Sequence, residues 1–516
     1  MSPSLPAWVE KRDGRREAFD ADKISQSIFA ATEAVGEPNA FLARELADGV
    51  LHFLVQENDS NVPTTGQIAE LVEKVVRELG QPALAQAFSE RQRSATATAP
   101  DKIARAPVTI TFTVDEAHND VRYRCSETYC LHAVFTRDLV AAHESGILDL
   151  RDVTAPGLSA MVLEPPQPKQ SMAAWKLGWS QIRDATERAA WLAVDSVERF
   201  VAAHGPDWLE GFVAAAQAYG NLVVLNLHVP TPPAWSGQIA AGPLFEDKNS
   251  PHDSILAEAA DAIVDILALD TNDLCGINWH VQAADLEDSK LRAMLESFWA
   301  RTRKLGQFTL HRARQPVRLA RGLDRQHPAV LFGVGLSLRE FLDHPGIDGD
   351  GAKMIAKLPS LVRMAVSAGA QRRNYLRRRD GDLSRGFLLD RARLLIEPWD
   401  LEEVVEAISG ADYWQSKLAL DTGRQLVQTL QDAAREAGRS AGLEVVVANF
   451  QGVEIYESLF KPDELASAWQ AAGSLLEGMD GGVVYVRRAE PSLDAVWRHL
   501  RHALKSTGVS KVCFWG

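Results

Sequence analysis

The cations near the N-terminus could bind a chain of phosphates. Lys11, Arg12 and Lys23 surround an Asp-Gly pair, and Asp-Gly between alternating charged and apolar residues is the strongest short-range signal for a β-hairpin. The pattern becomes helical from Ile24, and either Asp20 or Asp22 can cap that helix. Cations that converge near the start of a helix make an anion site, for which a phosphate chain is the natural ligand.

Two later segments place polar side chains inside otherwise apolar runs. Asn226 and His228 alternate in one run, and Asn278 and His280 alternate in another. Alternation along a strand puts both members of a pair on the same face of a sheet. Two interpretations stay open: the pairs line the polar, ligand-binding interior of a barrel, or they are satisfied polar residues at strand ends.

The cysteines and the standard catalytic motifs support no other chemistry. Cys125 and Cys130 lie near His132 and His143 in the sequence, so a zinc half-site and a redox pair are open alternatives. The spacing favours two ordinary thiols. No GxGxxG or Walker A motif follows a strand, and GxSxG, HExxH and kinase signatures are absent. We therefore predict no metal ligand and no catalytic residue.

Two basic runs stand out in a chain of net charge −14. One extends from Arg312 to Arg325, and the other contains Arg372, Arg373 and Arg377 to Arg379. Such runs can bind phosphates, nucleic acid or an acidic partner, but a solvated helix face paired with acidic neighbours is more common. The overall negative charge argues against broad nucleic-acid binding.

The length and composition are typical of a globular protein with two or three domains. The chain has 516 residues, of which 46% are hydrophobic and 24% charged. Four cysteines are too few for a disulfide scaffold in a chain of this length. The N-terminus has no apolar signal core, and no run approaches the ~20 apolar residues of a membrane span. A cytoplasmic protein without membrane association is expected.

The pattern of elements predicts an α/β fold. A mostly helical domain with a small hairpin at residues 1–94 is followed by a small, polar linker at 95–107 and a larger domain at 108–516. In that domain short apolar runs alternate with helices, which indicates a buried, largely parallel sheet, and the length favours a large α/β barrel. The predicted strands are at 108–114, 222–229, 276–281, 329–334, 443–448, 482–486 and 511–515, and 146–150 is a further apolar stretch. Helices are predicted at 135–144, 181–203, 208–218, 253–268, 286–305, 352–379, 401–409, 421–438, 462–477 and 491–506.

The N-terminal motifs resemble the ATP-cone, the nucleotide-sensing module of ribonucleotide reductases and of the repressor of their genes. The resemblance rests on Val9-Glu10-Lys11-Arg12-Asp13-Gly14, Lys23-Ile24, Val62-Pro63-Thr64-Thr65-Gly66-Gln67-Ile68, Leu79-Gly80, Ala85 and Arg91-Gln92-Arg93. It implies a nucleotide site in which Val9 and Ile24 border the base, Lys11, Arg12 and Lys23 hold phosphates, Glu17 and Asp20 lie near the ribose or base, Thr65 bonds the adenine edge, and Arg91 approaches the phosphates.

The remainder resembles the ten-stranded barrel of anaerobic, class III ribonucleotide reductases, which are glycyl radical enzymes. The similar segments are 141–150, 330–341, 357–379, 481–486 and 508–514. The family's radical cysteine lies shortly before the strand that matches 330–338, but this chain has 311–317 there and no cysteine between Cys275 and Cys513. The family's radical glycine and four-cysteine zinc site follow the last strand, whereas this sequence stops at Gly516. We expect neither of them.

The two resemblances together imply a regulatory protein that binds ATP or dATP, with Mg²⁺, on a barrel that has lost the reductase chemistry. Enzyme activity is left undecided, with a non-enzymatic role favoured. Homo-oligomerisation is expected, because cones in the family switch oligomeric state with the bound nucleotide. The alternatives are an enzyme of this family with altered chemistry in the barrel, and a regulator that contacts a reductase subunit. Direct DNA binding is not expected.

Overall fold

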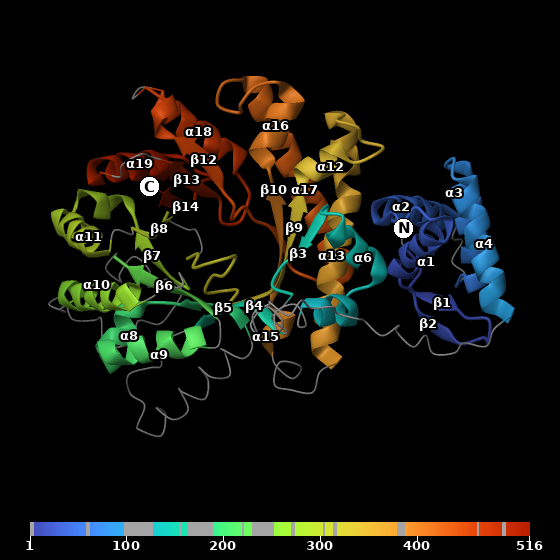
Figure 1. Ribbon diagram of the computed structural model, residues 1–516, viewed down its shortest axis with the longest axis horizontal. Helices are drawn as coiled ribbons and strands as arrows, with labels where there is room; N and C mark the ends of the chain where they lie inside the picture. The colour runs from blue at the N-terminus through green and yellow to red at the C-terminus, as the bar shows by residue number, and fades with distance from the viewer. Residues whose placement is uncertain are drawn as a thin grey trace, which may run out of the picture.

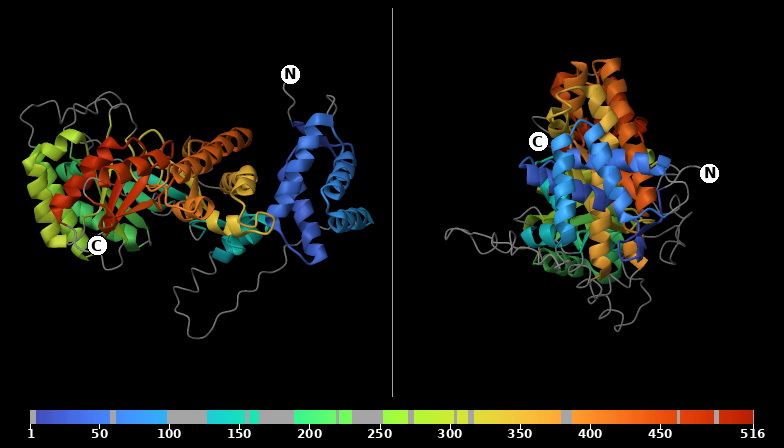
Figure 2. Two further views of the ribbon diagram at one scale, coloured as in Figure 1. Left: turned by 90° about the horizontal axis from the view of Figure 1, so that it is seen from above. Right: turned by 90° about the vertical axis from the view of Figure 1, so that its right-hand side faces the viewer.

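The computed structural model consists of an N-terminal helical domain at one end of a larger α/β domain (Figure 1; Figure 2). It describes residues 5–57, 62–97, 127–153, 157–163, 189–218, 221–229, 252–269, 274–302, 305–312, 317–378, 387–461, 464–487 and 492–515. The predicted strand at 108–114 lies outside these residues. Among the described helices, none combines the length and apolarity needed to cross a lipid bilayer.

The N-terminal domain begins with the predicted hairpin. Strands β1 (Trp8–Glu10) and β2 (Arg16–Ala18) are antiparallel, and the turn between them uses Gly14 at φ 79°, a left-handed conformation that favours glycine. Four helices follow: α1 (Asp22–Val35), α2 (Ala40–Glu57), α3 (Thr65–Glu78) and α4 (Pro82–Ala97). Helix α4 continues into the stretch predicted as linker, most of which lies outside the described residues.

The large domain is built on a mixed sheet of twelve described strands. Its first half is a run of parallel neighbours: β4 (Leu158–Leu163), β5 (Ala189–Val194), β6 (Leu222–His228), β7 (Cys275–Val281) and β8 (Gln307–Leu310). The second half has two parallel groups: β9 (Ala329–Ser337), β10 (Arg393–Trp399) and β11 (Val445–Val447), and then β12 (Val453–Tyr456), β13 (Val483–Arg487) and β14 (Lys511–Trp515).

The two halves run in opposite directions and close into a barrel. They meet at two antiparallel seams, where β4 pairs with β9 and β8 pairs with β14. The short strand β3 (Leu148–Leu150) also pairs with β9. A parallel bridge between Ala448 and Asp480 connects the β10–β11 edge to the β13 side. The predicted α/β barrel is confirmed.

Helices surround this sheet (Figure 1). In α19 the buried residues Val496, Leu500 and Ala503 recur at helical spacing, so one face packs inward and the charged face points outward. The helices of the domain are α6 (Arg137–Glu144), α8 (Val197–His204), α9 (Pro206–Ala218), α10 (His252–Leu269), α11 (Ser289–Thr302), α12 (Leu338–Asp343), α13 (Gly351–Arg378), α15 (Phe387–Asp390), α16 (Leu401–Ser409), α17 (Lys417–Ala441), α18 (Leu465–Leu475) and α19 (Leu493–Lys505), with short 3₁₀ turns at Ala283–Glu287 and Glu457–Leu459.

The predicted helix at 181–203 is wrong over much of its described length. The segment Ala189–Val194 is strand β5, which lies between β4 and β6. Its sequence is rich in alanine and leucine, and a short, fully apolar run cannot be assigned to strand or buried helix by periodicity alone. Strands β4, β8, β10 and β12 are not predicted from the sequence either.

The N-terminal domain packs against α6, α12 and α13 of the barrel. The ring of Phe41 in α2 meets Phe341 of α12 edge-on, with ring centroids 5.0 Å apart. Ion pairs add to this contact: Lys357 Nζ lies 2.8 Å from Glu45 Oε2, and Arg363 Nη2 lies 2.6 Å from Asp48 Oδ2. The two domains therefore share an interface with both apolar and charged contacts.

Candidate functional site

A cavity of about 660 Å³ opens between the hairpin and helices α1, α3 and α4. Every residue predicted for the nucleotide site lines it except Arg91: Val9, Lys11, Arg12, Glu17, Asp20, Lys23, Ile24 and Thr65. Its volume falls within the range of small-molecule pockets, about 300–1,000 Å³. Residues that are distant in sequence thus meet around one space.

Arg91 lines a neighbouring hollow of about 300 Å³. This hollow shares Lys23, Ser27, Phe88 and Gln92 with the main cavity. Arg91 projects from the last helix of the domain and is exposed. It therefore borders an extension of the cavity, on the same side as Lys23.

Backbone contacts hold the hairpin against the start of α3. The amide of Glu10 donates to the carbonyl of Pro63 at 3.0 Å, and Glu10 forms a bridge with Thr64. Thr64 caps α3 through a reciprocal capping box with Gln67. The local sequence Pro-Thr-Thr-Gly-Gln thus ends an extended segment and begins a helix at the same point, which places Thr65 on the cavity wall.

The charges at the hairpin are paired around Glu17. Its Oε2 lies 3.2 Å from Lys11 Nζ and 3.7 Å from Lys23 Nζ. The hydrogen bond from Lys11 and the charges of both lysines lower the pKa of the Glu17 carboxyl, although burial opposes the shift. A polyanion that entered the cavity would therefore compete with Glu17 for the two ammonium groups.

Part of the cavity wall is apolar. It contains Phe19, Ile68, Val72 and Phe88, none of which is predicted from the sequence to belong to the site. Apolar residues at helical spacing are indistinguishable from core residues until the helices pack. The cavity is therefore lined by both apolar side chains and cations, an arrangement that suits a ligand with an apolar ring and a phosphate chain.

The start of α1 connects this cavity to the barrel. Asp20 lines the cavity and accepts a hydrogen bond from the amide of Asp22 at 3.1 Å. The carboxylate of Asp22 then accepts from Arg44 of α2 at 2.9 Å and from Ser367 of α13 at 2.5 Å. One short stretch of backbone therefore contacts both the cavity and the barrel.

A second group of polar residues lies in the barrel interior. Asn226 pairs with Asn278, and His228 pairs with His280, on the neighbouring strands β6 and β7. All four side chains are buried. Asn278 Nδ2 donates to Asn226 Oδ1 at 2.8 Å and to the carbonyl of Leu319 at 2.8 Å. The two predicted pairs thus form one network rather than two separate ones.

The network is larger than the sequence pattern indicates. His311, just after β8, meets His280 with 2.7 Å between His280 Nδ1 and His311 Nε2. Asp195, just after β5, lies 2.6 Å from His228 Nε2. Arg325 bonds the same carboxylate at 2.7 Å. These residues are isolated in the sequence, and only the pairing of β5, β6, β7 and β8 brings them together.

Burial sets the protonation of this network. It lowers the pKa of His311 to about 3, with the charges of His228 and Arg325 adding to the effect. It also lowers the pKa of His280. Burial opposes ionisation of Asp195, but His228 and Arg325 outweigh it and hold the pKa of that carboxyl well below its usual value. His280 and His311 are therefore neutral, and Asp195 is ionised.

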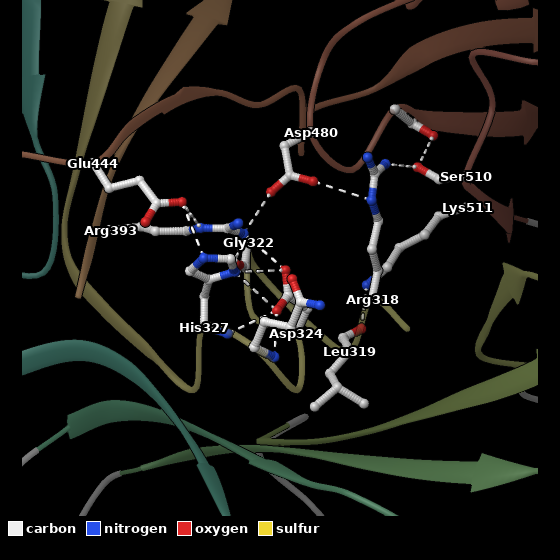
Figure 3. A network of polar contacts seen from close by, with 12 residues as sticks. Arg318, Leu319, Gly322, Asp324, His327, Arg393, Glu444, Asp480, Ser510 and Lys511 are labelled. Carbon is white, nitrogen blue, oxygen red and sulfur yellow. Dashed lines mark hydrogen bonds and ion pairs between the residues drawn. The ribbon is translucent and has the colours of Figure 1, made fainter. Parts of the chain in front are cut away.

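A loop between β8 and β9 enters the barrel (Figure 3). Residues Leu319, Ala320 and Leu323 are buried against strands β4, β5, β9 and β10. Lys511 Nζ donates to the carbonyl of Leu319 at 2.5 Å, and Arg393 Nη1 lies 2.9 Å from Asp324 Oδ2. This loop belongs to the segment where the resemblance places a radical cysteine, and the chain has none there.

The basic run that includes this loop is not a solvated helix face. Arg318 pairs with Asp480 at 3.0 Å, and Arg325 pairs with Asp195. Arg312 donates to carbonyls of the segment around the end of α19, including Val509 at 2.6 Å. In the second run Arg372 is buried and donates to the carbonyl of Gly157 at 2.9 Å. These arginines therefore connect separate elements of the barrel. The expectation that they form a solvated helix face is wrong at these positions.

Comparison with known proteins identifies the N-terminal domain and finds solved structures with a similar overall fold. Residues 8–94 match the ATP cone domain. The transcriptional repressor NrdR of Gloeobacter violaceus is 35% identical to this chain over 77 residues, which are 15% of this chain and 44% of the repressor. The chain thus spans less than half the length of that relative. The N-terminal domain is an ATP-cone, and we refer to it below as the cone.

The solved structures of anaerobic ribonucleotide reductases share the overall fold. The reductase from Thermotoga maritima in complex with dATP and CTP is similar with a TM-score of 0.55 and 10% identity, over 77% of this chain and 82% of that chain. The same enzyme with glycerol in the active site gives a TM-score of 0.56 over the same shares, also at 10% identity. At this identity the likeness concerns the fold: a cone followed by a reductase-like barrel.

Proposed function

We propose that this protein is a sensor of adenine nucleotides, in which the cone binds ATP or dATP and the barrel carries the response. The observation that supports the proposal best is the cavity, whose lining contains Lys11, Arg12 and Lys23 together with an apolar wall. The cations suit a triphosphate, with Mg²⁺ as its usual companion, and the apolar wall suits the adenine ring. Val9, Ile24 and Thr65 are assigned to the base, and Glu17 and Asp20 to the ribose or base.

The barrel is proposed to respond to the cone without reducing ribonucleotides by the family's route. That route needs a thiol on the loop inside the barrel, and this chain has no cysteine in 311–317 or anywhere between Cys275 and Cys513. The cone and the barrel are coupled through α1, because Asp20 borders the cavity while Asp22 bonds Arg44 and Ser367. A nucleotide that shifts the start of α1 would therefore alter contacts to α13. A change of homo-oligomeric state is the proposed output.

Calorimetric titration of the full chain with ATP, dATP, ADP and GTP tests the nucleotide site. Adenine triphosphates should bind, and Lys11→Ala should weaken dATP binding by about 10- to 100-fold, because a charge-assisted hydrogen bond contributes about 1.5–3 kcal/mol. Lys74→Ala is the matched control, since Lys74 is an exposed lysine of α3 outside the cavity. Light scattering during the titration reports the oligomeric state. An unchanged affinity in Lys11→Ala would refute the assigned phosphate contact.

A second candidate function is catalysis in the barrel interior. The network around Asn226, Asn278 and His280 favours it, because burying this many polar groups is costly unless they are used or fully bonded. Turnover of a nucleotide or sugar phosphate by the purified chain would support this alternative. Contact with a reductase subunit is a further alternative for the output, and co-purification with such a subunit in the presence of dATP would support it.

A further inference from the structure

Three histidines from different elements meet inside the barrel. His228 ends β6, His280 lies near the end of β7, and His311 follows β8. One ring nitrogen from each lies within 4.8 Å of the others. The rings of His228 and His280 have centroids 4.0 Å apart, and those of His280 and His311 are 4.9 Å apart. Among the described residues this is the group of side chains best placed to share one ion.

The neighbours of these histidines resemble the second shell of a metal site. The Asp195 carboxylate lies 2.6 Å from His228 Nε2, and Asn226 Oδ1 lies 2.8 Å from His280 Nε2. Histidines that bind metals typically donate their other ring N–H to a carboxylate or carbonyl, which fixes the tautomer and the ring orientation. Both contacts therefore prepare the rings for coordination.

The Asn226 amide orientation shows which nitrogen of His280 carries the lone pair. Asn226 Nδ2 donates to the carbonyl of Val194 at 3.1 Å, so its Oδ1 is free to accept from His280 Nε2–H. Asn278 Nδ2 also lies 3.2 Å from His280 Nε2, but its shorter bonds, both 2.8 Å, go to Asn226 Oδ1 and the carbonyl of Leu319. The neutral His280 ring then has its lone pair on Nδ1. This is the atom that lies 2.7 Å from His311 Nε2, so it points into the group of three histidines.

We propose that His228, His280 and His311 bind a divalent transition-metal ion, with Zn²⁺ as the first candidate. Imidazole nitrogen suits zinc, and three protein ligands leave a fourth position for water or a substrate atom. With Zn–N distances of about 2.0–2.1 Å, tetrahedral geometry separates ligand nitrogens by about 3.3 Å. His280 Nδ1 and His311 Nε2 would therefore move apart slightly, and the ion would replace their hydrogen bond. Asp195 and Asn226 are positioning residues.

Charged groups of both signs surround the three histidines. Asp195 is paired with Arg325 at 2.7 Å, so the arginine charge is balanced beside the histidines. Lys511 also lies inside the barrel, where its Nζ is bonded to the carbonyl of Leu319. Burial, and to a smaller extent the charge of Arg318, lowers the pKa of Lys511 to about 8 although Cys513 and Asp480 oppose the shift.

Metal content of the full chain tests the proposal. Chelator-stripped protein is titrated with Zn²⁺ in competition with a chromophoric chelator, and bound zinc is counted by elemental analysis. The wild type should bind one tight zinc ion. His311→Gln should weaken binding by more than about 100-fold, and Asp195→Asn by about 10- to 100-fold, the range for second-shell changes. His52→Gln, at an exposed histidine of the cone, should bind like the wild type.

Two further measurements separate this site from the thiols. Cys130→Ser should keep the full zinc affinity, because Cys130 lies outside the histidine group. X-ray absorption of the zinc-loaded wild type should show nitrogen ligands at about 2.0–2.1 Å without a sulfur shell near 2.3 Å. A sulfur shell, a loss of zinc in Cys130→Ser, or a wild type that binds zinc no better than His311→Gln would overturn the proposal. Because the X-ray absorption spectrum is measured on the wild type, it tests the ligand set even if a variant does not fold.

Discussion

Removal of Arg44 should weaken the attachment of the cone to the barrel. Its side chain is only 4% exposed, and its Nη1 lies 2.9 Å from Asp22 Oδ1. Burial opposes the charge of Arg44, but the carboxylates of Asp22, Asp138 and Asp48 outweigh burial and raise its pKa. Asp22 and Asp48 also bond α13, and Asp138 belongs to α6. Arg44 is therefore the shared counter-ion of the interface.

The expected cost of Arg44→Met is about 3 kcal/mol. Breaking a buried ion pair by removing one partner costs about 3–5 kcal/mol, since the other charge loses its compensation. The lower end applies, because the Asp22 side chain is 25% exposed and keeps its bond from Ser367. At about 1.4 kcal/mol per tenfold change, the docked state should become roughly 100-fold less favoured.

A double-mutant cycle measured by hydrogen–deuterium exchange checks this value. Arg44→Met and Asp22→Asn should each increase amide exchange in α1 and α6, and the double variant should cost less than the sum of the two by about 1–3 kcal/mol. Arg77→Met is the control, because Arg77 pairs with Glu73 on the exposed surface of α3 and should change stability by less than about 0.5 kcal/mol. Additive single costs would refute the assigned pairing.

Two further predictions concern the stability of the barrel: its dependence on pH through Glu402, and the effect of replacing Gly322. Burial, reinforced by the charge of Glu454, raises the pKa of Glu402 from 4.5 to about 8, so the folded state binds this proton more tightly and the free energy of unfolding should fall by about 4–5 kcal/mol as the pH rises from about 4.5 to 8. Urea unfolding at several pH values should show a loss that is larger by this amount in the wild type than in Glu402→Gln, because the variant keeps the other buried carboxyls with raised pKa values, including Glu198 and Glu397. Gly322→Ala should destabilise the chain by about 2–4 kcal/mol in the same assay, because Gly322 has φ +73° and the new Cβ would lie 2.5 Å from Leu395 Cδ2. Gly410→Ala is the control, because Gly410 has φ +75° and open space around it, and it should lower the free energy of unfolding by only about 1–2 kcal/mol. Equal losses for the two variants would show that Gly322 is not packed against Leu395.

The hairpin beside the cavity could be predicted because its signals are local. The Asp-Gly turn and the cations near the first helix lie within a few residues of one another, so their geometry follows from short-range rules, whereas the other residues of the predicted site came from the resemblance to the ATP-cone. The apolar wall could not be predicted in the same way. Phe88 and Ile68 occupy ordinary apolar helix positions, and only the packing of α3 and α4 against the hairpin turns them toward the cavity.

In the barrel, less could be predicted from the sequence and more depends on contacts between distant segments. Its apolar strands identify the fold class, but Ala189–Val194 reads as a helix until its place between β4 and β6 is known. The arginines near Arg318 are also misleading in sequence, because their acidic partners Asp480 and Asp195 come from distant parts of the chain. Long-range ion pairs leave no local pattern.

The amino-acid sequence alone predicted the hairpin with its cations and the α/β character of the rest from local propensity and hydrophobic pattern. The cone was indicated by the resemblance of its motifs, and the family match over residues 8–94 agrees with it. Only the tertiary structure decided that His228, His280 and His311 share one space, and that Arg44 links the cone to α6 and α13. Both features arise where strands or helices from separate segments become neighbours. The physical reason is that sheet order and domain docking are set by burial across the whole chain, which no single stretch encodes.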